Sequence, residues 1–240
     1  MAPGLILLHG FTHTGASWDP VRAQLGERYS ALAPDVRGHG TAAERRPVTL
    51  EAQIEDIAVL APARFTLVGY SMGGRIALHV ALALPERVQR LVLLGASPGI
   101  ADPLQRAQRR ASDERLAEQI ERSSIEEFAD TWAANPVLAD QPAGVQRLVR
   151  EDRLRNSPAG LAAALRGLGA GALPSVWERL SELRMPIALA AGERDVKFSQ
   201  IAEQMATRIG SAQVAIVPGA GHAVHLEQPA AVAVIIADGP

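Results

Sequence analysis

A serine, an aspartate and a histidine stand at three separated positions where they could act together in nucleophilic or acid–base chemistry. Ser71 is the centre of the pentapeptide Gly69–Gly73 (GYSMG), with an apolar strand pattern before it and a helix pattern after it. A serine in this G-x-S-x-G context lies on a sharp strand-to-helix turn, and glycine two positions to either side removes the Cβ atoms that would clash. We therefore expect the Ser71 hydroxyl to stand clear of the sheet, above the positive end of a helix.

The general base that a serine hydroxyl needs is supplied by His222. It ends the glycine-rich segment Pro218–His222 (PGAGH), directly after the last apolar run. His225 is the serious rival, but it lies further into the loop toward the following helix, so His222 is preferred. The other histidines have weaker positions: His9 ends the first strand, His39 lies in an RGHG turn, His79 lies within a helix, and His13 precedes any plausible site turn.

The carboxylate that would orient the base is Asp195, which follows the penultimate strand in Ala190–Asp195 (AAGERD). The alternative is a turn aspartate that bonds its own backbone. The order Ser71, Asp195, His222 along the chain is the order of α/β-hydrolases, and other serine-triad folds order these groups differently. We therefore predict an α/β-hydrolase fold whose catalytic residues are these three.

Two backbone N–H groups are expected to form an oxyanion hole. One belongs to Phe11, which follows the first strand, and the other to Met72, the residue after the serine. A metal site is not expected, because His222 and His225 are not spaced by one helical turn and no third ligand stands at a telling distance.

The elements that must position these groups are short apolar runs alternating with amphipathic segments, the pattern of a mostly parallel sheet flanked by helices. Pro85 ends the helix that begins at the serine. The predicted strands are Gly4–His9, Tyr29–Ala33, Phe65–Gly69, Arg90–Leu94, Ile187–Ala191 and Gln213–Val217, and the predicted helices are Thr49–Leu60, Ser71–Leu84, Glu114–Ile120, Glu126–Trp132 and Leu161–Leu168.

The alternation stops between about Pro98 and Pro174, where charged helical patterns replace strands. We interpret residues 98–174 as a helical lid insertion, and residues 1–97 and 175–240 as the α/β-hydrolase core. Ligands of open α/β sheets bind at the carboxyl ends of the strands, which such a lid would cover.

The composition favours a small-molecule ligand. The 240 residues are 48% hydrophobic and 21% charged, and the net charge of −2 gives no reason to expect nucleic acid or a membrane surface as a partner. No cysteine is present, which excludes disulfides and a cysteine nucleophile. No apolar stretch is long enough to span a membrane, so a cytoplasmic protein is the simplest expectation. The residues carry no signal for an oligomeric state. The 24 basic residues are arginines except Lys197.

The chain contains the segments LHGFTHTGASW, DVRGHG, LVGYSMGGRIAL, LLGASPGIADPLQRAQRRASDERLA, RGLGAGALPSVWERL, AGERDVKF and VPGAGHAVHLEQP. Together they resemble one family within the α/β-hydrolase superfamily, the 2-succinyl-6-hydroxy-2,4-cyclohexadiene-1-carboxylate (SHCHC) synthases of menaquinone biosynthesis. The resemblance covers essentially the whole chain, and the hydrolase motifs within it are shared with many esterases. The discriminating segments are GASPGIAD to DERLA, the region Trp132–Pro136 and Asp195–Phe198 (DVKF).

The resemblance implies a lyase that eliminates pyruvate and needs no cofactor, with the serine acting as part of a base. A substrate with several carboxylates also demands arginines. Arg75 lies one helical turn beyond Ser71 on the same face. Arg109 and Arg153 match arginines that the family uses for carboxylates, with Arg110 and Arg155 as alternative registers, and Tyr70 and Trp132 resemble pocket residues of the family.

Two other functions stay open. A hydrolase of a small ester, lactone or carbon–carbon diketone would use the same triad, although a neutral substrate would not need Arg75. A binding protein that has lost catalysis would not need a strained serine beside a base.

Overall fold

A parallel sheet of six strands forms the centre of the computed structural model, which describes residues 4–135, 141–210 and 212–238. The strand order is β2-β1-β3-β4-β5-β6, and each pair of neighbouring strands is parallel. The strands are β1 Gly4–Leu8, β2 Ser30–Leu32, β3 Phe65–Tyr70, β4 Val88–Leu94, β5 Ile187–Gly192 and β6 Ala212–Val217. All six predicted strands are confirmed, with ends that differ by one or two residues.

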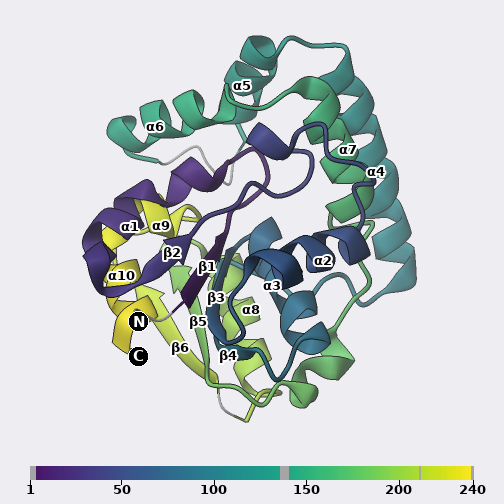
Figure 1. The fold of residues 1–240 in the computed structure, drawn as a ribbon. Coiled ribbons are helices and arrows are strands. Elements are labelled where there is room, and N and C mark those ends of the chain that lie inside the picture. Colours follow the sequence, from purple (N-terminus) through teal and green to yellow (C-terminus); the bar gives the residue numbers. More distant parts are fainter. Residues whose placement is uncertain (1–3, 136–140, 211, 239–240) are drawn as a thin grey trace.

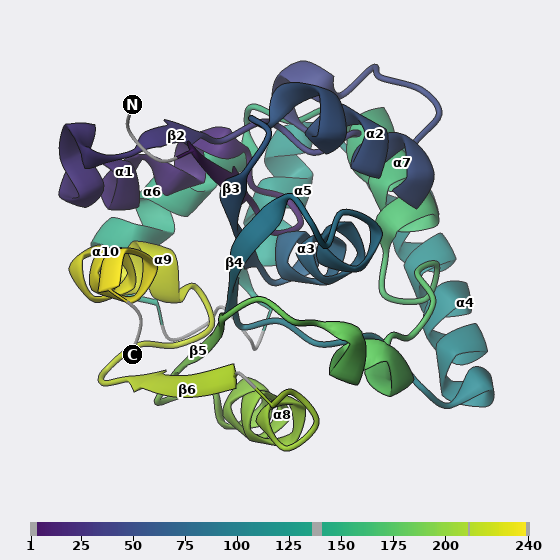
Figure 2. The same ribbon diagram turned by 60° about the horizontal axis from the view of Figure 1, so that its bottom comes forward.

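Helices cover both faces of this sheet (Figure 2). On one face lie α1 Asp19–Leu25, α9 Val224–Glu227 and α10 Pro229–Asp238, and on the other lie α2 Leu50–Leu60, α3 Met72–Ala83 and α8 Val196–Ala206. Alternate strand residues serve the two faces: Leu5 and Leu7 pack in the cluster with α1 and α10, whereas Ile6 and Leu8 pack in the cluster with α3. This is the predicted α/β arrangement.

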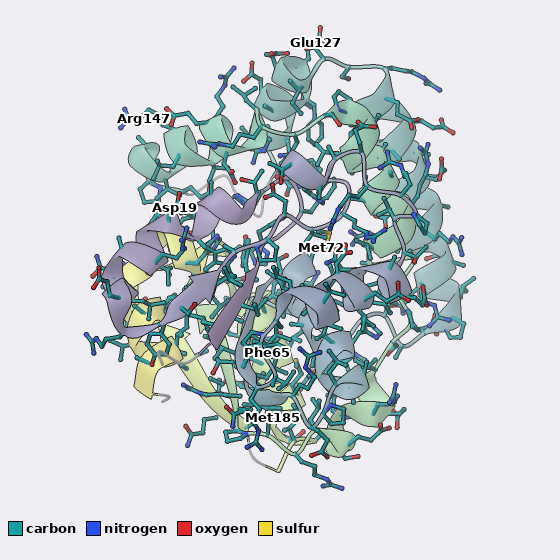
Figure 3. The ribbon with its side chains drawn as sticks, viewed as in Figure 1. Asp19, Phe65, Met72, Glu127, Arg147 and Met185 are labelled. Carbon is teal, nitrogen blue, oxygen red and sulfur yellow. The ribbon has the colours of Figure 1, made fainter. Side chains whose placement is uncertain are left out.

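Among the residues that the structure describes between β4 and β5 are four α-helices: α4 Pro103–Glu121, α5 Ile125–Ala133, α6 Ala143–Arg153 and α7 Pro158–Leu168. They form a layer of their own at the top and right of Figure 1, with a small core that includes Ile120, Phe128 and Leu165. Figure 3 shows Met72, just beyond the end of β3, closer to this layer than Phe65 at the start of β3. The layer therefore lies over the carboxyl ends of the strands. The division at residues 98 and 174 stays a prediction.

The helix predicted over Glu114–Ile120 is only the second half of α4. The helix starts at Pro103 with Asp102 as its N-cap, because the Asp102 side chain accepts from the backbone N–H of Gln105 at 2.7 Å. Its first half is rich in exposed arginine and has no apolar stripe, so periodicity alone misses it. Residues 136–140, which include Pro136 of the family-like segment, lie outside the described residues.

No helix in the described part of the chain combines the length and the apolar character needed to cross a membrane.

Candidate active site

The three residues of the predicted triad meet in one line of hydrogen-bonding atoms. Oγ of Ser71 lies 3.2 Å from Nε2 of His222, and Nδ1 of His222 lies 2.6 Å from a carboxylate oxygen of Asp195. The side chains of His222 and Asp195 are both less than a tenth exposed. An imidazole held between a hydroxyl and a buried carboxylate can accept the serine proton and then be stabilised as imidazolium.

The backbone at Ser71 has the strained geometry expected of the strand-to-helix turn. Its φ is +51°, in a region that residues with a Cβ rarely adopt, and its amide donates to the carbonyl of Leu94 at 2.9 Å. A Cβ on Gly69 would lie 2.5 Å from the carbonyl oxygen of Gly73, and one on Gly73 would overlap the carbonyl of Leu8. Both glycines are therefore required by close backbone approach.

His225 does not approach the serine. It is fully buried against the rings of Tyr70, at 4.2 Å, and Trp18, at 4.9 Å between centroids, and neither ring nitrogen has a partner. Burial lowers the pKa of His225 well below the ordinary histidine value, and the nearby His13 and His222 lower it further. His225 is enclosed and makes no hydrogen bond to Ser71, whereas Nε2 of His222 lies 3.2 Å from Oγ of Ser71, so the geometry favours His222 as the base.

Asp195 combines the two roles weighed for it. Besides its contact with His222, it is the N-cap of α8, where Oδ1 accepts from the Phe198 backbone N–H at 3.5 Å. The Phe198 ring lies 4.6 Å from that of His222 and covers one side of it. The turn thus fixes the carboxylate and the imidazole together.

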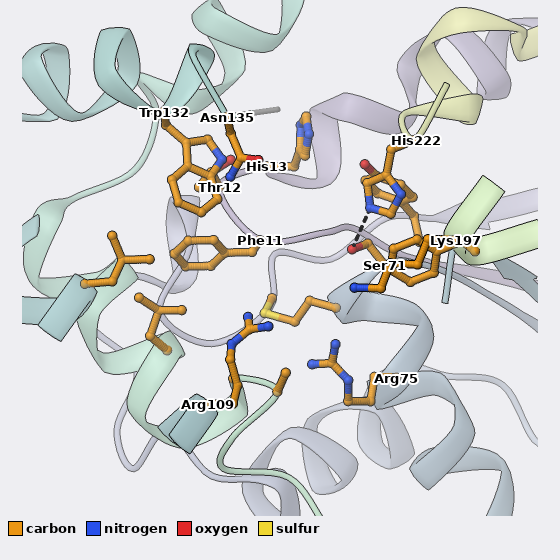
Figure 4. A pocket seen from close by; sticks show the side chains of 17 residues that line it. Phe11, Thr12, His13, Ser71, Arg75, Arg109, Trp132, Asn135, Lys197 and His222 are labelled. Atoms are coloured by element: carbon orange, nitrogen blue, oxygen red, sulfur yellow. Dashed lines mark hydrogen bonds between the residues drawn. The ribbon is translucent and has the colours of Figure 1, made fainter. Parts of the chain in front are cut away.

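A cavity of about 260 Å³ opens on Ser71 and His222 (Figure 4). It is bounded by the loop after β1, the start of α3 and the helices α4, α5 and α7. The residues of the predicted oxyanion hole, Phe11 and Met72, both line it, as do Tyr70 and Trp132. The Phe11 and Trp132 rings meet edge to face at 5.5 Å, which joins the loop after β1 to α5.

Cationic side chains occupy another side of the cavity. Arg75 and Arg109 both line it, and Figure 4 shows their guanidinium groups close together. Burial lowers the pKa of Arg75 to about 10, with a further lowering by Arg109 and an opposing effect of Asp113, so Arg75 stays charged at neutral pH. Its Nε is buried without a partner. Such a group is poised to bind an anion.

Arg109, and not Arg110, faces the cavity. Nε of Arg109 donates to Asp113 at 2.7 Å, and the Arg109 side chain is about half exposed. Arg110 is exposed and lies with its backbone against Gly171. The structure thus has Arg109, and not Arg110, in the lining of the cavity. Contact of Arg109 with a substrate carboxylate stays a prediction.

Arg153 does not line the cavity. It is 1% exposed, with Nε 3.3 Å from the Thr12 hydroxyl and Nη1 donating to the carbonyl of Ala129 at 3.0 Å. Burial lowers its pKa to about 10, so the guanidinium stays charged behind Thr12, which does line the cavity. Arg155, the alternative register, is exposed and lies 3.9 Å from Asp152. A direct carboxylate contact by Arg153 stays a prediction.

Several cavity residues were not predicted. Lys197 lies two residues beyond Asp195 and enters the cavity beside Ser71 in Figure 4, with Nζ 5.5 Å from the centroid of the Phe198 ring. Lys197 is the single lysine of the chain, and this is the sequence signal that could have identified it as a cavity residue. His13 also lines the cavity, contrary to the expectation that it precedes the site. The remaining unpredicted lining residues are Thr12, Leu116, Asn135, Leu165, Gly169, Ala170 and Phe198.

No metal-binding group of three or more histidine, aspartate or glutamate side chains is present among the residues that the structure describes.

Comparisons with known proteins identify the family and the fold. The model of the alpha/beta hydrolase family matches residues 5–235. The 2-succinyl-6-hydroxy-2,4-cyclohexadiene-1-carboxylate synthase of Salmonella schwarzengrund is 35% identical over 242 residues, covering 96% of this chain and 91% of that protein.

Solved structures show the same likeness. MenH from S. aureus superposes with a TM-score of 0.92 at 30% identity, covering 98% of this chain and 92% of that one. A thermophilic esterase from Thermogutta terrifontis superposes with a TM-score of 0.83 at 25% identity, covering 98% and 88%. This chain belongs to the alpha/beta hydrolase family and, within it, to the family of 2-succinyl-6-hydroxy-2,4-cyclohexadiene-1-carboxylate synthases.

Proposed function

We propose that this protein is a carbon–oxygen lyase of menaquinone biosynthesis, which eliminates pyruvate from 2-succinyl-5-enolpyruvyl-6-hydroxy-3-cyclohexene-1-carboxylate to give SHCHC. One observation carries the proposal beyond family membership: the cavity that holds Ser71 and His222 is also lined by Arg75, Arg109 and Lys197. Three cations suit a substrate with several carboxylates, and a neutral ester has no use for them.

The locants of substrate and product define the bond changes. The ring proton at carbon 2, beside the succinyl ketone, is removed; the double bond at carbon 3 gives way to double bonds at carbons 2 and 4; and the bond from carbon 5 to the enolpyruvyl oxygen breaks. We assign proton removal to Ser71, whose own proton passes to His222. We assign stabilisation of the resulting imidazolium to Asp195. No covalent bond to the serine is needed.

Negative charge develops on the ketone oxygen as the ring proton leaves. We assign its stabilisation to the backbone N–H groups of Phe11 and Met72, which act at the positive end of α3. Their side chains are replaceable in this role. We assign the carboxylates to the cations of the cavity, and contact with the ring and its substituents to Tyr70 and Trp132.

The elimination only transfers protons and shifts electron pairs of the substrate, so no cofactor enters the proposal. The proposed substrate is a small polycarboxylate, and neither nucleic acid nor a membrane is a proposed partner. A cytoplasmic location is also part of the proposal, and its support is the composition described above.

Pyruvate release provides the test. The enolpyruvyl substrate and a generic aryl ester such as 4-nitrophenyl acetate should be compared at equal enzyme concentration, with pyruvate followed through lactate dehydrogenase. We expect fast pyruvate release and slow ester cleavage. Fast ester turnover without pyruvate would support the second candidate, a small-ester hydrolase, which is favoured by the likeness to the T. terrifontis esterase.

A further inference from the structure

A second histidine–aspartate pair faces the same cavity. Nδ1 of His13 lies 3.1 Å from Oδ2 of Asp152, and His13 lines the cavity beside Tyr70. The two residues are 139 positions apart, on the loop after β1 and on α6. Among the described residues, only this pair and His222 with Asp195 join an imidazole to a carboxylate.

Asp152 is held as firmly as a catalytic carboxylate. It is buried, and it accepts hydrogen bonds from the Thr14 hydroxyl at Oδ1 and from the Thr14 backbone N–H at Oδ2, the latter at 2.9 Å. Burial raises the pKa of this carboxyl, but the bonds from His13 and Thr14 outweigh burial and bring the pKa below its ordinary value. An ionised Asp152 can only accept, so it keeps a proton on Nδ1 of His13 and fixes the orientation of the ring.

The other ring nitrogen of His13 is free to act. Nε2 has no hydrogen-bond partner in residues 4–135, 141–210 and 212–238. The ring nitrogens of His39 and His225 also lack partners but are completely buried, whereas Nε2 of His13 is not. Figure 4 shows His13 on the far side of the cavity from Arg75 and Arg109. In the imidazolium form Nε2 carries a proton that it can give to a ligand.

The proposed elimination requires such a donor. Carbons 2 and 5 are opposite corners of the ring, so the group that takes the proton at carbon 2 stands away from the oxygen that leaves carbon 5. We infer that His13, held by Asp152, donates a proton from Nε2 to the departing enolpyruvyl oxygen while Ser71 and His222 remove the ring proton. This inference rests on the proposed function.

The step balances. The C–H bond at carbon 2 breaks and its proton passes to Ser71, whose own proton passes to His222, while the C–O bond at carbon 5 breaks and its electron pair takes the proton of His13. The product leaves as the enol of pyruvate, which becomes the keto form. His222 then loses a proton to solvent and His13 gains one.

Other groups near His13 are poorer donors. A lysine ammonium such as Lys197 is a much weaker acid than an imidazolium. The Tyr70 ring lies 5.9 Å from that of His13. Burial raises the pKa of Tyr70, and Asp195 and Glu227 raise it further. The imidazoles of His9, His39 and His225 are fully buried, and burial lowers the pKa of each, so they are neutral. The remaining charged groups that face the pair are Arg153 and Arg155.

The test compares His13→Gln with the wild-type protein in pyruvate release, with kcat and KM measured from pH 5.5 to 9. We expect kcat to fall about 100-fold, KM to change little, and the alkaline limb of the kcat/KM profile to disappear, because general acid catalysis contributes about 10²- to 10⁴-fold. His79→Gln is the matched control, since His79 lies on α3 and does not line the cavity. It should keep wild-type kcat and profile.

A second variant covers the case in which His13→Gln does not fold. Asp152→Asn removes the carboxylate that orients the His13 ring, so kcat should fall, by less than in His13→Gln, while KM changes little. Melting temperature and labelling of Ser71 by a fluorophosphonate probe report whether each variant keeps its fold and triad.

Three results would overturn the inference. A raised KM with unchanged kcat and profile in His13→Gln would make His13 a carboxylate contact only. Unchanged kcat and KM would give it no role. If the wild-type protein releases no pyruvate, the proposed function is rejected, and the role of His13 as proton donor with it. If the wild-type protein releases pyruvate normally and His13→Gln is unaffected, only the role of His13 is rejected.

Discussion

The backbone N–H of Arg75 donates to the carbonyl of Ser71 at 3.1 Å, so the guanidinium and the serine hydroxyl are held one helical turn apart at the same end of α3. This end of the helix faces the cavity, and Nε of Arg75 lacks a partner there. An anion bound by Arg75 is therefore placed directly beside the reacting group. In the proposed reaction, α3 would thus position both the reacting hydroxyl and a cation for the substrate.

Arg75→Gln should lower kcat/KM for pyruvate release about 100-fold, because a charge-assisted hydrogen bond to a carboxylate contributes about 1.5 to 3 kcal/mol. Arg75→Lys should recover only part of the loss, since an ammonium cannot bind a carboxylate in the bidentate manner. Steady-state kinetics with the melting temperature of each variant checks this. Equal kcat/KM in Arg75→Gln and wild type would rule out the contact.

Arg109→Gln should raise KM by roughly tenfold, whereas Arg110→Gln should leave it unchanged. The two neighbours have the same charge and lie on the same helix, but only Arg109 lines the cavity. Arg110→Gln is therefore the matched control for the general electrostatic effect of losing one cation. A larger effect of Arg110 than of Arg109 would contradict the register of α4.

Ser71→Ala should abolish most turnover, by at least about 10³-fold, while the dissociation constant of SHCHC measured by calorimetry changes little. The hydroxyl contributes to proton removal and not to the carboxylate contacts. Unchanged ligand binding and unchanged biological function in this variant would instead indicate a binding protein.

His79 should make the fold less stable in acid. Burial lowers its pKa to about 4, with a further lowering by Arg75, against an ordinary value of 6.5. The unfolded chain therefore binds a proton between these pH values that the folded chain does not, so the free energy of unfolding falls as pH drops from 6.5 to 4, by about 3 kcal/mol for this residue. Urea unfolding of wild type and His79→Gln at pH 7 and pH 4.5 checks this, and an equal pH dependence in both proteins would refute it.

The sheet and the triad were predictable because their signals are local. Strands buried on both faces are continuous apolar runs, as in β3, and the strained turn at Ser71 needs glycines at fixed offsets. The order of Asp195 and His222 along the chain then follows from the ends of consecutive strands. Local patterns of this kind do not depend on distant contacts.

The rest depends on how the helices between β4 and β5 fold back over the sheet. The contact of His13 with Asp152 joins the first loop to α6 and has no sequence motif, so the sequence does not predict that His13 reaches the site. The burial of Arg153 behind Thr12 likewise follows from the packing of α6 against that loop. An arginine-rich helix shows which residues are charged, but its periodicity does not show which of them face inward.

The role of Ser71 is tested most directly by intact-protein mass spectrometry during turnover of the enolpyruvyl substrate, quenched in acid within the first few turnovers. If Ser71 acts as part of a base, the protein mass stays unmodified while pyruvate accumulates. A transient adduct on Ser71, formed and lost at the rate of pyruvate release, would contradict this and indicate nucleophilic catalysis.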